Sequence, residues 1–178
     1  MRPTRDDWAM ALVDACASRT TCLRRAVGCV LLNARGHVLA TGYNGVAAGL
    51  PHCNEAEDVR RIFKGQIIDA VYTSPYGEEQ SIGVDGLFFP RACPGATSPS
   101  GTNLDGCQAI HAEQNALLQC RDVWAIDTCY VSASPCLTCV KLLLNTSCQR
   151  IVFREGYPHG DAEKLWRQAG RDWVKYHK

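Results

Sequence analysis

Two short strings of metal-binding side chains constrain the fold more than any other feature of the sequence. His111 and Glu113 open the segment HAEQNALLQC, and Cys136 and Cys139 follow about twenty-five residues later in the string PCLTC. One imidazole and two thiolates are the protein ligands of a catalytic zinc site, which keeps its fourth position for water. Whatever fold the chain adopts must therefore bring these two strings to one ion.

The local pattern around each string supports this grouping. Cys136 and Cys139 are three residues apart at the start of an expected helix, so they share one face of it. Both strings open helices, where free N–H groups and the helix dipole favour thiolates. Glu113 lies two residues from His111, where it can exchange a proton with water without being a ligand. Taken singly, the C-x-x-C could be a redox pair and the histidine a surface residue. The combination of H-x-E with P-C-x-x-C is the signature of zinc nucleobase deaminases.

Length and composition favour a single soluble domain. The chain has 178 residues, of which 46% are hydrophobic and 21% charged, which excludes a disordered chain, a collagen-like rod and a coiled coil. The longest apolar run, residues 26–32, is far short of the ~18–20 residues that span a bilayer. The N-terminus has no apolar stretch that could act as a signal peptide. We therefore expect a cytoplasmic protein with no membrane association.

Charge and cysteine usage narrow the function further. A net charge of +1 provides no large positive field, which argues against stable nucleic-acid binding. The eleven cysteines would not form lasting disulfides in a reducing cytosol, so some should bind metal and others should pack as small hydrophobes. Those expected in the core, from the apolar patterns around them, are Cys16, Cys29, Cys120, Cys129 and Cys148.

The order of elements predicts an α/β protein. Thr4 and Asp7 are a plausible cap for a first helix that ends near residue 18, and a β-hairpin is expected from residues 26–33 and 37–43. Further strands are expected at 128–132, 150–153 and 172–176, and further helices at 111–120, 136–145 and 162–168. A hairpin followed by alternating strands and helices predicts a mixed sheet in a three-layer α/β/α arrangement.

The middle of the chain is less regular. Residues 44–110 are too many for a structureless loop inside a compact domain unless something holds them. A helix is expected where Asn54 can act as a cap and Glu57 follows three residues later. Residues 94–106 are rich in Pro, Gly, Ser and Thr, and Cys93 and Cys107 flank them.

Five strings resemble deoxycytidylate (dCMP) deaminases of the cytidine deaminase superfamily, in the form found in bacteria and their phages. They occupy residues 21–28, 41–45, 111–116, 134–139 and 155–158. The resemblance implies the cytidine-deaminase-like fold, with a five-stranded mixed sheet, helices on both faces and a long insert after the second strand. It also implies one zinc-dependent deaminase domain over residues 1–178, in which 54–106 is a family-variable insert.

The chemistry implied by the resemblance matches the chemistry expected from the residues. Zinc lowers the pKa of a bound water to about 7. Glu113 takes that proton and delivers it to ring N3 of cytosine, so that hydroxide can attack C4. Glu113 then protonates the leaving amine, which gives dUMP and ammonia and feeds thymidylate synthesis.

Several other residues are candidates for contact with the nucleotide. By resemblance, Asn44 is aimed at the sugar hydroxyl, although Tyr-Asn-Gly is also a good turn sequence. Arg24 and Arg25 precede the first strand and could bind a phosphate or lie on a solvated surface. Tyr157 resembles a tyrosine near the nucleotide, with core or rim packing as the alternative, and Ser134 belongs to a matching string.

A second zinc, with a structural role, is a further prediction. The resemblance assigns Cys22 and Cys53 to it, and Cys93 and Cys107 could complete it, with His52 as a substitute. Such a site would attach the irregular middle segment to the hairpin. The alternative is a set of four ordinary thiols.

The resemblance also implies a homohexamer, activated by dCTP and inhibited by dTTP with Mg²⁺ at a site that includes the GYNG string. Related substrates remain alternatives: 5-substituted dCMP, dCTP, a free base, a nucleoside or a tRNA adenosine, the last disfavoured by the small net charge. A zinc-binding protein without turnover is a further alternative, but such a site would have no need of Glu113.

Overall fold

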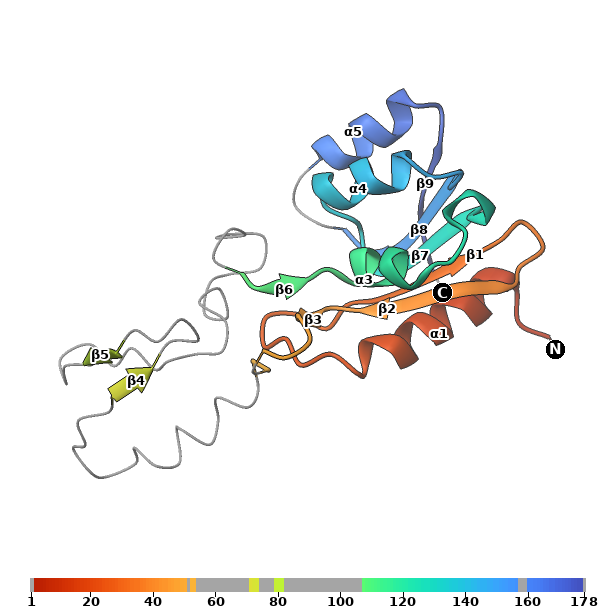
Figure 1. The fold of residues 1–178 in the computed structure, drawn as a ribbon. Coiled ribbons are helices and arrows are strands. Elements are labelled where there is room, and N and C mark those ends of the chain that lie inside the picture. Colours follow the sequence, from red (N-terminus) through yellow and green to blue (C-terminus); the bar gives the residue numbers. More distant parts are fainter. Residues whose placement is uncertain are drawn as a thin grey trace.

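The structure is a computed structural model, and it describes residues 2–50, 52–53, 71–73, 79–81, 107–156 and 160–177. Its main elements, in chain order, are α1 (Arg5–Ala17), β1 (Gly28–Leu32), β2 (Val38–Tyr43), α3 (Ala112–Gln119), β7 (Thr128–Ala133), α4 (Leu137–Leu144), β8 (Arg150–Glu155), α5 (Asp161–Gln168) and β9 (Asp172–Lys175) (Figure 1). A short 3-10 turn, η2 (Val123–Ala125), precedes β7. Each helix and strand expected within the described residues is present, with ends displaced by one or two residues.

The main sheet has five strands in the order β2-β1-β7-β8-β9. β1 runs antiparallel to both β2 and β7, whereas β7, β8 and β9 are parallel. This is the mixed sheet that the sequence predicts. Because β1 is antiparallel to both neighbours, the start of β1 lies at the same edge as the ends of β2, β7 and β8.

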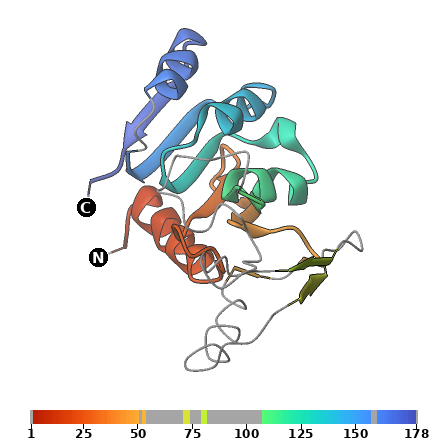
Figure 2. The same ribbon diagram turned by 90° about the vertical axis from the view of Figure 1, so that its left-hand side faces the viewer.

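Helices cover both faces of the sheet, as expected for three layers. Alternate residues of a strand point to opposite faces, so Val30 and Leu32 pack with α1 residues, while Cys29 and Leu31 join the core under α3, α4 and α5. All five residues of β1 are buried, as befits a strand covered on both sides. Figure 2 shows α1 on one side of the sheet and the other helices opposite.

Helix α1 is held to the sheet by polar contacts at its start. The Thr4 hydroxyl accepts a hydrogen bond from the Asp7 N–H at 3.1 Å and the Asp7 carboxylate accepts one from the Thr4 N–H at 3.2 Å, which is the expected cap. Asp6 pairs with Arg150 of β8 at 2.7 Å and accepts a hydrogen bond from the Tyr130 hydroxyl at 2.7 Å. The hydrogen bond from Arg150 lowers the pKa of Asp6.

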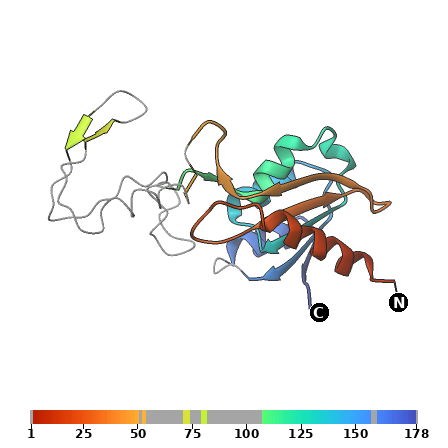
Figure 3. The same cartoon turned by 90° about the horizontal axis from the view of Figure 1, so that it is seen from below.

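The two ends of the described chain lie along the same side of the coloured ribbon in Figure 3. The Tyr176 hydroxyl, just after β9, donates a hydrogen bond to the Asp7 carboxylate at 2.6 Å. Helix α1 is therefore joined to both β8 and the segment that follows β9.

Two glycines allow helices to lie unusually close to the hairpin. A Cβ atom on Gly28 would come within 2.1 Å of the Val13 carbonyl oxygen in α1, and one on Gly42 within 2.2 Å of the Ala112 carbonyl oxygen in α3. Both contacts are with backbone, which cannot move aside as a side chain could. These positions therefore require the absence of a side chain.

A short ladder joins the flanks of the irregular middle segment. β3 (Gly45–Val46) pairs antiparallel with β6 (Ala109–Ile110), so the chain leaves the hairpin and returns to α3 at one place. The pattern in the sequence did not indicate this ladder. β4 (Val71–Thr73) and β5 (Glu79–Ser81) pair with each other. The helix expected from Asn54 lies outside the described residues.

The cysteines expected in the core follow the prediction in part. Cys29, Cys129 and Cys148 are fully buried. Cys16 and Cys120 also pack against the core, but they are only half-buried and not fully buried as expected. Each lies near the end of a helix, where the core is open on one side. Among the described residues, no helix combines the length and apolar character needed to cross a bilayer.

Candidate active site

The candidate site lies at the sheet edge where β1 begins and β2, β7 and β8 end. Cys136 follows β7 and is the N-cap of α4, and His111 is the N-cap of α3. The His111 N–H donates a hydrogen bond to the Gln114 side chain at 2.9 Å, which fixes the start of α3. Ligands at the carboxyl ends of strands are the common arrangement in open α/β sheets.

The structure brings the three expected zinc ligands together. The Nδ1 atom of His111 lies 3.5 Å from the Cys136 sulfur and 3.4 Å from the Cys139 sulfur. A tetrahedral zinc, with bonds of about 2.0–2.1 Å to nitrogen and about 2.3 Å to sulfur, separates such atoms by about 3.5 Å. The side chains are therefore already spaced for the metal. Within the described ranges, no other group of three or more His, Cys, Asp or Glu side chains has its ligand atoms close enough together to hold one metal ion.

The charges at this group also suit a cation. A hydrogen bond with Cys139, aided by His111, lowers the pKa of Cys136 to about 4. The hydrogen bond to Cys136 raises the pKa of Cys139, and burial of its sulfur raises it further. A divalent cation between the two sulfurs would stabilise both as thiolates.

Glu113 is a buried carboxyl group beside the three ligands. It lies in the first turn of α3 and is 4% exposed. Burial raises its pKa to about 7. A carboxyl group with such a pKa can both accept and donate a proton near neutral pH. This is the property that the sequence interpretation required of Glu113.

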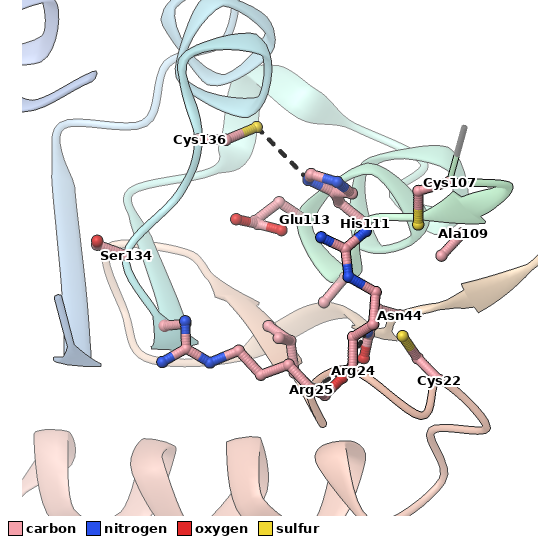
Figure 4. Close-up of a pocket in the computed structure, with 13 residues that line it drawn as sticks. Cys22, Arg24, Arg25, Asn44, Cys107, Ala109, His111, Glu113, Ser134 and Cys136 are labelled. Carbon is pink, nitrogen blue, oxygen red and sulfur yellow. Dashed lines mark hydrogen bonds between the residues drawn. The ribbon is translucent and has the colours of Figure 1, made fainter. Parts of the chain in front are cut away.

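A pocket opens in front of these residues and has an empty volume of about 610 Å³, including the space open to solvent. Its lining includes every described residue expected to contact the nucleotide or the catalytic metal, apart from buried Cys139 (Figure 4). The residues concerned are Arg24, Arg25, Asn44, His111, Glu113, Ser134 and Cys136. Tyr157 and Cys93 lie outside the described residues.

Asn44 lines the pocket and is 8% exposed. Its side-chain oxygen accepts hydrogen bonds from the Val27 N–H and the Thr20 hydroxyl, each at 2.8 Å. Its amide nitrogen donates to the Arg25 carbonyl oxygen at 2.8 Å. One of the two amide protons is used in that bond, so the other can be offered to a ligand. The turn interpretation and the sugar-contact interpretation are thus compatible.

The two neighbouring arginines extend in different directions. Figure 4 shows Arg24 reaching towards His111 and Glu113, whereas Arg25 extends away from them. The Arg25 guanidinium forms an ion pair with Glu155 at the end of β8. The side chains are 27% and 61% exposed, so this pair lies at the rim of the pocket. Sequence reasoning missed Glu155 as a partner, because the contact depends on β7 lying between β1 and β8.

The residues expected at a second zinc lie close to the base of the middle segment. Cys53 is buried against Val46, and Cys107 packs against the same pair. His52 contacts the Thr21 hydroxyl at 3.0 Å, and Cys22 and Cys107 both line the pocket. Cys22, His52, Cys53 and Cys107 are all described, but no three of them bring their ligand atoms together as His111, Cys136 and Cys139 do. The four-ligand set therefore stays a prediction, and Cys93 lies outside the described residues.

Comparison with known proteins identifies the family. A family profile described as "Cytidine and deoxycytidylate deaminase zinc-binding region" matches residues 3–155. The chain belongs to this family. The matched range contains His111, Glu113, Cys136 and Cys139.

Two curated relatives carry the name deoxycytidylate deaminase. The one from Saccharomyces cerevisiae is 31% identical over 173 residues, covering 96% of this chain and 44% of its own length. The one from Mycobacterium phage D29 is 31% identical over 153 residues, covering 85% of this chain and 95% of its own. The chain therefore spans less than half of the yeast protein and almost all of the phage protein.

A solved structure has the same fold. The crystal structure of dCMP deaminase from the cyanophage S-TIM5, in complex with dCMP and dUMP, superposes with a TM-score of 0.62 at 20% sequence identity. The match covers 99% of both chains. The cytidine-deaminase-like fold expected from the sequence is thereby confirmed.

Proposed function

We propose that this protein is a zinc-dependent hydrolase that converts dCMP and water to dUMP and ammonia. The observation that carries the proposal is Glu113, a buried carboxyl group with a pKa of about 7 beside His111, Cys136 and Cys139. A structural metal site has no use for such a group. The names of the yeast and phage relatives support dCMP as the substrate.

The residues of the chain divide the chemistry between them. His111, Cys136 and Cys139 would hold zinc, which when bound activates water as a nucleophile at neutral pH. Glu113 accepts a proton from that water and donates it to ring N3 of cytosine, which makes C4 more electrophilic. After the water oxygen has bonded to C4, Glu113 carries the second proton of that oxygen to the amine, and the C4–N bond breaks to give dUMP and ammonia. Burial keeps the pKa of the carboxyl group near 7, which suits both transfers.

The rim residues would bind the rest of the nucleotide. We assign the 5′-phosphate to Arg24 and Arg25, because guanidinium groups match phosphate oxygens in shape and charge. Asn44 would offer its second amide proton to the sugar hydroxyl, and Ser134 lines the same pocket. Tyr157 follows β8 closely in sequence and is assigned to the nucleotide by family resemblance.

The proposal also covers features of the whole enzyme. A second, structural zinc held by Cys22, Cys53, Cys93 and Cys107, with His52 as a substitute ligand, is supported by the packing of Cys53 beside Cys107. A homohexamer with dCTP and dTTP effectors and Mg²⁺ rests on family resemblance. A cytoplasmic location rests on the cysteine-rich composition of the chain, which suits a reducing compartment.

Ammonia release from a panel of substrates tests the proposal. The panel is dCMP, 5-methyl-dCMP, dCTP, deoxycytidine and cytosine, each with and without dCTP plus Mg²⁺. We expect the highest kcat/KM for dCMP. A higher kcat/KM for another member of the panel would make that compound the substrate instead of dCMP. If the zinc-loaded protein turned over no member, the chain would be a zinc-binding protein and not a deaminase.

A further inference from the structure

The side chain of Asn44 makes contacts that a sugar-binding residue does not need. Its amide group bridges two points on the segment that carries the arginines, the Arg25 carbonyl oxygen and the Val27 N–H, each at 2.8 Å. Its backbone N–H also donates to the Val27 carbonyl oxygen at 3.1 Å. This side chain therefore fixes the backbone from which Arg25 extends.

Thr20 supports Asn44 from behind. Its hydroxyl lies 2.8 Å from the Asn44 side-chain oxygen and 2.6 Å from the Asn44 carbonyl oxygen. It also accepts a hydrogen bond from the Cys22 N–H at 3.2 Å. Thr20 is half-buried and does not line the pocket. Its effect on binding would therefore pass through the residues that it holds.

The arginine segment needs such support. Residues 19–27 connect α1 to β1 without a helix or strand of their own, and Arg24 and Arg25 extend from this connection in different directions (Figure 4). A phosphate-binding guanidinium is effective when its position is fixed before binding, because ordering a long side chain and its backbone opposes association. The hydrogen bonds of Asn44 and Thr20 order the backbone of this connection, while the ion pair with Glu155 holds the Arg25 guanidinium.

We propose that Asn44 and Thr20 are positioning residues that hold Arg24 and Arg25 in place and thereby determine the preference for a phosphorylated substrate over the nucleoside. This inference rests on the proposed function. It differs from a sugar contact in a measurable way, since dCMP and deoxycytidine have the same sugar and base and differ in the phosphate.

The test compares kcat/KM for dCMP with kcat/KM for deoxycytidine. The change Thr20→Val removes the hydroxyl while keeping the shape of the side chain. We expect it to lower the ratio of the two values about five-fold, the effect of one net hydrogen bond, with deoxycytidine turnover kept within about two-fold. Asn44→Ala should lower the ratio about ten-fold or more, because it breaks both bridges. Ser18→Ala, which removes an exposed hydroxyl bonded to the Ala15 carbonyl oxygen, should leave the ratio unchanged.

Two further measurements separate the possible failures. Wild-type turnover of dCMP tests the proposed function itself, and an inactive wild type would overturn that function and this inference together. With an active wild type, equal losses for dCMP and deoxycytidine in both variants would overturn the inference and leave the function standing. Circular dichroism and zinc content show whether each variant is folded. If Asn44→Ala does not fold, Thr20→Val alone provides the test.

Discussion

At the scale of single residues, the environment of Glu113 decides whether this site can catalyse a reaction. A glutamate on a protein surface is ionised at neutral pH and is a poor proton donor. Burial raises the pKa of Glu113 to about 7, and its place in the first turn of α3 keeps it beside His111. The side chain can therefore serve as base and as acid in one reaction.

We expect Glu113→Gln to abolish turnover while zinc is retained. The amide keeps the size of the side chain but cannot accept or carry the proton, and the loss of a general acid-base group costs about 10²–10⁴ in kcat. Ammonia release and zinc content of the purified variant are the measurements. Glu163→Gln, on the exposed face of α5, is the matched control and should behave as wild type. Substantial activity in Glu113→Gln would remove Glu113 from the mechanism.

At the scale of elements, the packing of α3 against the hairpin determines where the residues at the start of α3 lie. Gly42 of β2 lets α3 approach until the Ala112 carbonyl oxygen occupies the place of a side chain. Gly28 of β1 does the same for α1 on the opposite face. The proposed catalytic residues lie at the start of α3, whereas α1 contributes none, so the two glycines form a natural pair for comparison.

Gly42→Ala should reduce kcat far more than Gly28→Ala. Each substitution forces a helix away from the sheet, because the new Cβ would lie within 2.2 Å of backbone oxygen. Displacement of a catalytic group by about 1 Å can cost about 10²-fold in rate. We expect that order of loss in Gly42→Ala, measured as kcat per folded, zinc-loaded molecule. In Gly28→Ala we expect lower Tm with kcat within about three-fold of wild type. Similar kcat values in the two variants would contradict this role for α3.

The attachment of α1 to β8 should make stability depend on pH in acid. The pKa of Asp6 is lowered in the folded protein by Arg150, so the ion pair stabilises the fold above the unfolded-state pKa of about 4. That stabilisation is lost as pH falls through the lower, folded-state pKa. Asp6→Asn should therefore reduce the free energy of unfolding by about 1–2 kcal/mol at pH 7, and the difference from wild type should vanish near pH 2.

Urea unfolding of both proteins across this pH range is the measurement. Asp14→Asn serves as the control, because the Asp14–Arg154 pair is more exposed and should contribute less. A difference between wild type and Asp6→Asn that persists at pH 2 would show that the ion pair is not its source.

At the scale of the whole molecule, the number of bound zinc ions tests how the middle segment is attached. The β3–β6 ladder and the packing of Cys53 beside Cys107 place two of the expected ligands at the base of this segment. We expect two zinc ions per chain by atomic emission, and one in Cys53→Ser. We expect Cys53→Ser to have a lower Tm, because metal binding stabilises the fold that holds the ion.

A measured content of one zinc per wild-type chain would refute the second site.

Removal of zinc from the wild-type protein by a chelator should abolish ammonia release, and added Zn²⁺ should restore it. Loss and recovery of activity together would tie turnover to the group formed by His111, Cys136 and Cys139.

The sequence by itself determined the main helices and strands and the residues of the proposed catalytic group. The continuous apolar run in β1 and the helical spacing in α1 are local patterns, and they placed these elements to within one or two residues. His111, Glu113, Cys136 and Cys139 were identifiable because each ligand type has a limited chemistry and the short spacings place the pairs on helix starts.

The tertiary structure alone decided which distant residues support one another. The pair between Arg25 and Glu155 arises from the strand order, and the close approach of α3 to Gly42 arises from the packing of that helix on the sheet. Strand order joins segments that are far apart in sequence, and no local periodicity encodes which strands are neighbours. The chemistry of a ligand group follows from its residue types, which the sequence shows. The hydrogen bonds, ion pairs and helix packing that hold the group in place depend on which segments the fold makes neighbours.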